Sequence, residues 1–393
     1  MPLTDMTDML AHAYRHGYAL GAFAVADLES LSGVMAAAEA SRAPLLLAPE
    51  AADESRLELL LPAVEAAARR SEVPVAIQLA VAADPEAVAR AIRLGGNGIR
   101  VAPPQDSFPR SVQQTQAAAA TAQACGLAAE AAPAAELVGT AAEARRFVDR
   151  SGIDGLRLDL APGHSGGGNR KGRLDYNRLK QVDQTLGSPL SVDPGEDLSE
   201  DQYHRLIRHG VAAIACRIRL PQAAGDEGGD PLAGLADAVA AEAERRMRVW
   251  GAAGRAAEVL AQCTPWEGAE QVLLCNFPEA PEGGTEAALA RGEELLGRIP
   301  GVREAAGMAA ASDDAPYRYA WRVRLCHSAA LASFQEHPDR AALANGGVHP
   351  GAQGCTGIPY RRIPAGTAAA SPSAEASAAK VAALAPGHWR NPA

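Results

Sequence analysis

The chain has 393 residues, of which 48% are hydrophobic and 21% are charged, and its formal net charge is −10. A chain of this length can bury a large core and is longer than one typical domain, while the negative charge excludes nucleic acid and anionic membrane surfaces as its main partners. No apolar run reaches the roughly 18 residues that a membrane span needs.

The N-terminus and the cysteines indicate the compartment. Asp5 and Asp8 stand where a signal peptide would carry basic residues. The six cysteines are scattered, without a C-x-x-C pair, so neither a disulfide framework nor a thiolate zinc site is indicated. We therefore expect a cytoplasmic protein whose cysteines are buried free thiols.

In the first 218 residues, short apolar runs alternate with Ala-rich stretches of helix length. This alternation is typical of βαβ units, and strands that are apolar on both faces suit a parallel sheet covered by helices. We predict an α/β (β/α)8 TIM barrel over residues 1–260. The expected strands are Ala19–Val25, Pro44–Ala48, Pro74–Ala80, Gly98–Ala102, Gly126–Ala131, Gly155–Leu160, Pro189–Asp193 and Ala212–Ile218.

The pattern changes after residue 218. A turn-rich loop, "PQAAGDEGGDP", precedes one or two helices over Leu232–Leu260. Residues 264–363 then show the order β-α-β-β-α-β, which predicts an α+β ferredoxin-like domain. The tail over residues 364–393 is rich in Ala, Ser and Pro, and we expect it to be disordered.

Several segments in colinear order carry a family resemblance. They are "MTDMLAHAYRHGYALGAFAVADLES", "VPVAIQLAVA", "GHSGGGNRKGRLDYNRL" and "SPLSVDPGEDLSEDQYHRLIRHGVAAIACRIRL". Over about residues 1–258 the chain resembles the class II, zinc-dependent ketose-bisphosphate aldolases of carbohydrate metabolism. The resemblance implies a TIM barrel and a carbon–carbon lyase, in which zinc polarises the substrate ketone and an Asp moves the proton.

The positions that the resemblance assigns to this chemistry are mostly changed. The first zinc-binding His falls at Val81, the catalytic Asp at Ala80 and the third His at Asp193, so we expect no catalytic residue at these positions. The middle His corresponds to His164. His164 and Asp193 form at most a two-ligand metal site, or His164 is a hydrogen-bonded loop residue. We therefore expect no cofactor, and zinc only if that residual pair is a real site.

The phosphate-binding side of the family pattern is also altered. Arg217 and Ile218 replace an Asn and a Thr of the last strand, and "PGED" replaces a Gly-Gly-Ser-Gly loop. Pro194 in this loop has no N–H to offer, and its two carboxylates repel an anion.

Basic residues near the same end of the barrel suggest a different anion site. Lys171, Arg173 and Arg217 are candidate ligands for an anionic small molecule. The alternative is that they are solvated loop charges that pair with Glu196 or Asp197.

Two acidic residues also lie at predicted strand ends. Glu50 and Glu130 are candidate acid or base groups, or they pair with a neighbouring arginine such as Arg100 or Arg157.

The C-terminal region has a resemblance of its own. "EQVLLCNFPEAPEGGTEAALARGEELLGRIPGVREAAGM" and "YRYAWRVRLCHSAALASFQEHPDRAAL" are similar to the stress-responsive A/B barrel (Dabb) family. This resemblance implies a dimeric A/B barrel, and hence a homodimer formed through the C-terminal domain. Phe334 and Arg340 stand where some relatives have a catalytic Tyr and His, so an acid/base pair is missing here too.

Two functions of different class follow. In the first, the chain is a pseudoenzyme, a dimeric binding, regulatory or assembly protein that takes an anionic small molecule or a protein partner. In the second, it is a divergent aldehyde-lyase acting on a phosphorylated or acidic sugar-like substrate. The number of changed family positions favours the first.

Overall fold

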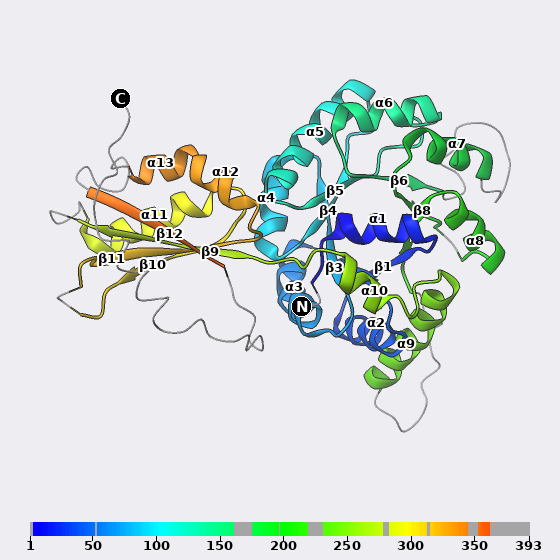
Figure 1. Cartoon of the computed structure of the whole chain (residues 1–393), viewed down its shortest axis with the longest axis horizontal. Coiled ribbons are helices and arrows are strands. Elements are labelled where there is room, and N and C mark those ends of the chain that lie inside the picture. The colour runs from blue at the N-terminus through cyan, green and yellow to red at the C-terminus, as the bar shows by residue number, and fades with distance from the viewer. Residues whose placement is uncertain are drawn as a thin grey trace. The chain divides into compact units, whose positions relative to one another are not determined.

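A computed structural model of the chain describes residues 3–51, 53–160, 175–195, 197–218, 231–277, 283–312, 315–344 and 353–361. Eight parallel strands form a closed barrel in which each strand pairs with the next and β1 pairs with β8 (Figure 1). The predicted TIM barrel is therefore confirmed. Its strands are β1 Leu20–Val25, β2 Leu45–Pro49, β3 Val75–Ala82, β4 Gly98–Ala102, β5 Ala128–Ala131, β6 Gly155–Asp159, β7 Leu190–Asp193 and β8 Val211–Cys216.

A helix follows each barrel strand. Six of these helices begin after a residue whose side chain accepts a backbone N–H three residues on: Asp27, Asp53, Asp84, Thr140, Asp175 and Ser199. Such N-caps satisfy a backbone donor that the first helical turn leaves free, and they fix where each helix starts. The helices are α2 Leu28–Ser41, α3 Glu54–Arg70, α4 Pro85–Leu94, α5 Phe108–Ala124, α6 Ala141–Ser151, α7 Tyr176–Leu186, α8 Glu200–Arg208 and α9 Pro231–Val249.

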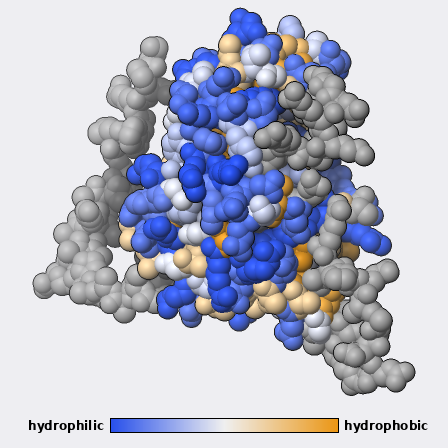
Figure 2. All heavy atoms as spheres, turned by 90° about the vertical axis from the view of Figure 1, so that its right-hand side faces the viewer, coloured by the Kyte–Doolittle hydropathy of each residue, from blue (hydrophilic) through white to orange (hydrophobic). Residues whose placement is uncertain are grey.

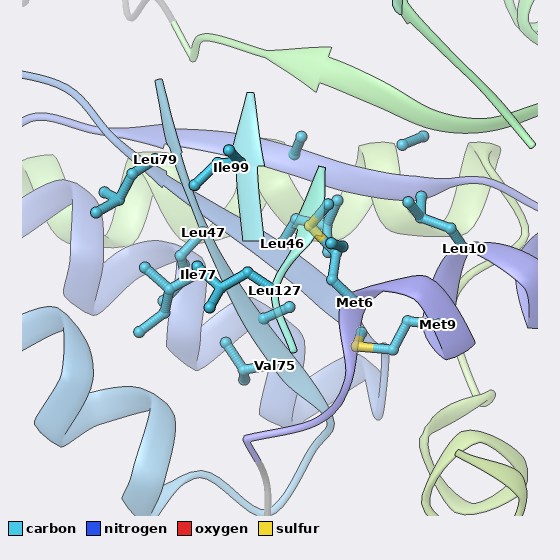
Figure 3. Close-up of a cluster of buried hydrophobic side chains, with 14 of the residues drawn as sticks. Met6, Met9, Leu10, Leu46, Leu47, Val75, Ile77, Leu79, Ile99 and Leu127 are labelled. Carbon is cyan, nitrogen blue, oxygen red and sulfur yellow. The ribbon is translucent and has the colours of Figure 1, made fainter. Parts of the chain in front are cut away.

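An additional helix, α1 (Met6–His16), covers the N-terminal end of the barrel, with α10 (Ala256–Gln262) beside it (Figure 1). Figure 3 shows Met6 and Met9 of α1 among apolar side chains of the strands. The contact with β4 is so close that a Cβ at Gly98 would lie 2.4 Å from the Met6 sulfur. Because Gly98 has no side chain, α1 can pack closely against the N-terminal end of the barrel.

The C-terminal region forms a four-stranded antiparallel sheet in the order β10-β11-β9-β12. The predicted order of strands and helices is found, with the short helix α13 added. Trp321 of β11 donates its indole N–H to the Leu289 carbonyl of α11, at 3.0 Å, so this face of the sheet is covered by helix. The elements are β9 Ala269–Asn276, α11 Gly284–Gly297, β10 Val302–Ala309, β11 Tyr319–Leu325, α12 Ala330–Glu336, α13 Pro338–Ala344 and β12 Gln353–Arg361.

Apolar residues and cysteines are buried, and the surface is largely hydrophilic. Among the residues whose side chains the structure describes, five cysteines are buried and free, as predicted: Cys125, Cys216, Cys263, Cys275 and Cys326. Hydrophilic residues predominate on the face drawn in Figure 2. Among the described residues, no helix has the length and hydropathy that crossing a membrane requires.

Residues up to Arg361 group into one compact unit by their contacts. The predicted division between residues 260 and 264 stays a prediction, and the predicted disordered tail lies outside the described residues.

Candidate functional site

A pocket of about 640 Å³ opens at the C-terminal ends of the barrel strands. In TIM barrels this end carries the functional groups. Small residues line much of its wall: Ala22, Ala24, Ala48, Ala132 and Ala215. Charged residues line the rest and include Glu50, Arg100, Arg157, Asp159, Asp193, Asp197, Arg217 and Arg246. The alanines leave space that long side chains from neighbouring strands can enter.

Arg157 of β6 contacts a residue of the neighbouring strand β7. Its side chain is only 8% exposed, and its Nη2 donates to Oδ2 of Asp193 at 2.9 Å. The other Asp193 oxygen, Oδ1, accepts the backbone N–H of Gly195. Both carboxylate oxygens of Asp193 are therefore already used within the protein.

Glu130 of β5 lies deeper, with 2% of its surface exposed. Its Oε2 accepts a hydrogen bond from Nε2 of Gln78 on β3 at 3.0 Å. We expected Glu130 to pair with an arginine, but within the described part of the chain its hydrogen bond comes from Gln78 instead.

Arg100 of β4 is the neighbour of Glu130 in the sheet register. Among the described residues it has no hydrogen bond and no ion pair. Burial lowers the pKa of Arg100, and the adjacent Arg157 lowers it further, while Glu130, Glu50 and Asp193 act in the opposite direction. Arg100 is thus a largely buried cation that faces a pocket and lacks a direct partner in this part of the chain.

The arginines at the pocket rim are paired. Arg217 donates through Nε and Nη2 to Oε2 of Glu50, at 3.1 and 2.6 Å, and this contact raises the pKa of Arg217. Arg246 of α9 contacts Asp197 at 2.5 Å and Glu242 at 2.6 Å. The charges of Arg217 and Arg246 are therefore compensated by direct ion pairs, whereas Arg100 has no direct ion pair within the described part of the chain.

Comparison with known proteins identifies the barrel. The model of the family "Fructose-bisphosphate aldolase class-II" matches residues 4–257. The chain belongs to the class II aldolase family. It is 26% identical to a sulfofructosephosphate aldolase of Alkalicoccus urumqiensis over 223 residues, which are 52% of this chain and 77% of that protein. It is 30% identical to a fructose-bisphosphate aldolase of Thermus caldophilus, over 52% of this chain and 72% of that one.

Solved structures agree on the fold. The crystal structure of the YdjI aldolase from Escherichia coli K12 superposes with a TM-score of 0.54 at 21% identity, covering 65% of this chain and 99% of that chain. The antiparallel sheet over residues 269–361 lies beyond the match to the aldolase family.

Class II aldolases use zinc, but the described residues that the sequence resemblance assigns to the zinc site do not fit it. A catalytic zinc needs three protein ligands with nitrogen, oxygen or sulfur donors. Val81 and Ala80 at the end of β3 carry no donor atom, and Val81 packs against the hydrophobic core. Asp193 holds a guanidinium at 2.9 Å, and this positive charge disfavours a metal cation on the same carboxylate.

The other predicted site residues divide into two groups. His164, Lys171 and Arg173 lie outside the described residues, so their predicted metal and ligand roles stay predictions. Arg217 lies at the pocket rim as expected, immediately after β8, and its partner is Glu50.

Arg100 and Arg157 were expected only as partners of acidic residues, not as pocket residues. The signal that could have revealed them is a single arginine in the middle of each of the apolar strands "GIRVA" and "GLRLD". A charged residue inside a barrel strand must face the interior or a neighbour that compensates it.

Proposed function

We propose that this chain is a non-catalytic member of the class II aldolase family that binds a small anionic ligand, phosphorylated or acidic and sugar-like, at the C-terminal end of its barrel. In this proposal it acts as a dimeric binding, regulatory or assembly protein in the cytoplasm. The observation that carries the proposal is Arg100, a largely buried cation that lines the pocket.

A guanidinium removed from water is costly unless a hydrogen-bonded anion compensates it. Arg157 lies close enough to lower the pKa of Arg100, so an anion seated between them would be attracted by both. Guanidinium groups bind phosphate and carboxylate in a bidentate geometry.

The proposal that the chain is non-catalytic rests on the residues at the C-terminal ends of β3 and β7. Aldol cleavage in this family needs a metal for the ketone and an acid for the proton. Ala80 cannot exchange a proton, and Val81 cannot bind a metal. Asp193 is held by Arg157.

The binding experiment uses the full chain, freed of metal with a chelator, and isothermal titration with inorganic phosphate, fructose 1,6-bisphosphate and uncharged fructose. We expect the anions to bind and fructose not to bind. Arg100→Gln should weaken anion binding by about tenfold or more, since a charge-assisted hydrogen bond contributes roughly 1.5–3 kcal/mol. The matched control is Arg90→Gln, which removes an exposed arginine of α4 that pairs with Glu54. Equal affinity in the Arg100→Gln and Arg90→Gln variants would contradict the proposal.

One observation favours the second function, a divergent aldehyde-lyase. Glu130 is a buried carboxylate next to Arg100 and accepts one hydrogen bond, from Gln78, so a carboxylate and a guanidinium lie together below the pocket. If this pair is catalytic, the chain should release a triose phosphate from a ketose bisphosphate, and Glu130→Gln should abolish the release while leaving binding intact.

The homodimer is proposed through the antiparallel sheet, which we assign to the Dabb type of ferredoxin-like domain. The strand order β10-β11-β9-β12 supports this assignment. Along β9, buried residues alternate with half-buried ones such as Val272 and Leu274, which face away from the helices that cover the sheet. We expect Leu274→Arg to convert a dimer to a monomer in native mass spectrometry, and Leu59→Arg, on the exposed surface of α3, to leave the dimer intact. A wild-type monomer would contradict the proposed dimer.

A further inference from the structure

At the N-terminal end of the barrel, opposite the pocket, two histidines and a glutamate converge. His12 and His16 lie one turn apart on α1, and Glu258 lies on the adjacent helix α10. One ligand atom from each of the three side chains can be chosen so that all lie within 4.8 Å of one another. Residues four apart on a helix share a face, so both imidazoles are presented toward α10.

His12 has an unsatisfied polar atom in this cluster. The residue is fully buried, and its Nδ1 lies 3.0 Å from the Tyr18 hydroxyl. Its Nε2 is buried without a hydrogen-bond partner among the described residues. Buried polar atoms are nearly always satisfied, and an exception points to a missing partner or ion.

We propose that His12, His16 and Glu258 bind one divalent metal ion such as zinc, nickel or copper. With the metal on Nε2 of His12, Nδ1 carries the proton and donates it to the Tyr18 oxygen. Such an outer hydrogen bond is what orients a metal-binding imidazole. Two nitrogens and one carboxylate oxygen suit zinc, nickel or copper, and do not suit calcium or magnesium, which require more oxygens.

The geometry requires only small side-chain movements. Metal–ligand distances of roughly 2.0–2.2 Å place tetrahedral ligand atoms about 3.3 Å apart. His12 is fixed by burial and by Tyr18. His16 and Glu258 are exposed, and His16 must rotate out of its stack on the His12 ring, whose centroid lies 4.2 Å away, to share the ion. A water molecule completes the fourth position.

Two arginines oppose the ion. Arg255 donates to Glu258 at 2.8 Å, and Arg15 lies near His12. The Arg255–Glu258 pair is half-exposed, with 33% and 48% of the two side chains accessible, and exposed pairs contribute little. The metal can therefore bind Glu258 together with Arg255 or in place of it. The bound metal would link α1, which covers the N-terminal end of the barrel, to α10. Its role is structural, because the pocket lies at the other end of the barrel.

The test uses the full chain after chelator treatment, with zinc titrated by calorimetry and cobalt followed by its visible absorption. We expect one site with tetrahedral cobalt bands, and a rise in Tm when zinc is added. His16→Ala and Glu258→Gln should each weaken zinc binding by at least tenfold and remove the rise in Tm. Both residues are exposed, so neither change removes a core side chain.

Two further variants make the result decisive. His204→Ala removes an exposed histidine of α8 and should bind zinc as the wild type does. Asp193→Asn should also leave the site intact, because Asp193 lies in the pocket at the opposite end. The proposal is overturned if the wild type binds no zinc, if His16→Ala and Glu258→Gln bind it normally, or if Asp193→Asn abolishes binding.

Discussion

Glu65 of α3 accepts hydrogen bonds from two arginines that are far apart in the sequence. Arg303 of β10 donates to both of its oxygens, at 2.6 and 2.7 Å, and Arg69 donates to Oε1 at 2.8 Å. Burial alone would raise the pKa of Glu65, but the hydrogen bonds and charge of Arg303, with those of Arg69, lower it from 4.5 to about 2. The carboxylate therefore ties the antiparallel sheet to the barrel.

This contact predicts how stability depends on pH. Because the pKa of Glu65 is lower in the folded chain, its contribution is complete above pH 4.5 and is lost as the pH falls toward 2. The shift corresponds to about 3 kcal/mol at neutral pH. Urea unfolding between pH 7 and pH 3 should show a shallower loss of stability in Glu65→Gln than in the wild type. The exposed control Glu54→Gln should follow the wild type, and the same slope in all three proteins would refute this role of Glu65.

Some residues of the pocket could be predicted from the sequence, and their partners could not. The sequence predicts Arg217 at the C-terminal end of the barrel because it lies near the end of the last predicted strand, Ala212–Ile218. Its partner Glu50 lies 167 residues away, and no local pattern indicates that pairing. For the same reason, the sequence does not predict that Arg100 lacks a direct partner among the described residues, because whether a buried arginine is paired depends on side chains from other strands.

Among the elements, α2 and α9 pack most closely where α2 has a glycine. A Cβ at Gly33 would lie 2.5 Å from the backbone oxygen of Ala236 and 2.7 Å from Cβ of Val239, both on α9. Backbone atoms in a packed interface cannot move cheaply. Gly33 therefore allows the last helix of the barrel to close against the first.

We expect Gly33→Ala to destabilise the protein by about 1–3 kcal/mol, the usual cost of overpacking. Gly297→Ala is the matched control, since no atom lies within 4 Å of the position its Cβ would take on α11. That change should be neutral within about 0.5 kcal/mol. The two free energies of unfolding, measured in urea, distinguish the cases, and equal values would show that α9 shifts without cost.

Elements with strong periodicity were predictable, and two helices were not. The strand Gly98–Ala102 matches the prediction to the residue. The helix Met6–His16 was not predicted, although Asp5 caps it and Gly17 ends it with a positive φ of 65°. The seven-residue helix Pro338–Ala344 is too short to show a period.

At the scale of the whole molecule, the chain has the barrel of the family, while the described positions that the sequence resemblance assigns to the zinc site carry other side chains. Fold and chemistry separate here because they depend on different residues: the core is set by apolar strand residues, whereas the chemistry depends on a few strand ends. In this chain those ends carry Ala80, Val81 and an Asp193 held by Arg157. The resulting pocket is lined by the guanidinium groups of Arg100 and Arg157.

Zinc-dependent cleavage is the measurement that tests this account most directly. The full chain, supplied with excess zinc, is incubated with fructose 1,6-bisphosphate, and the release of triose phosphate is followed by a coupled assay. The account predicts no release above the buffer rate, with or without zinc, although the bisphosphate binds. Release that requires zinc and stops on adding a chelator would contradict it, because it would show that the aldolase site is still functional.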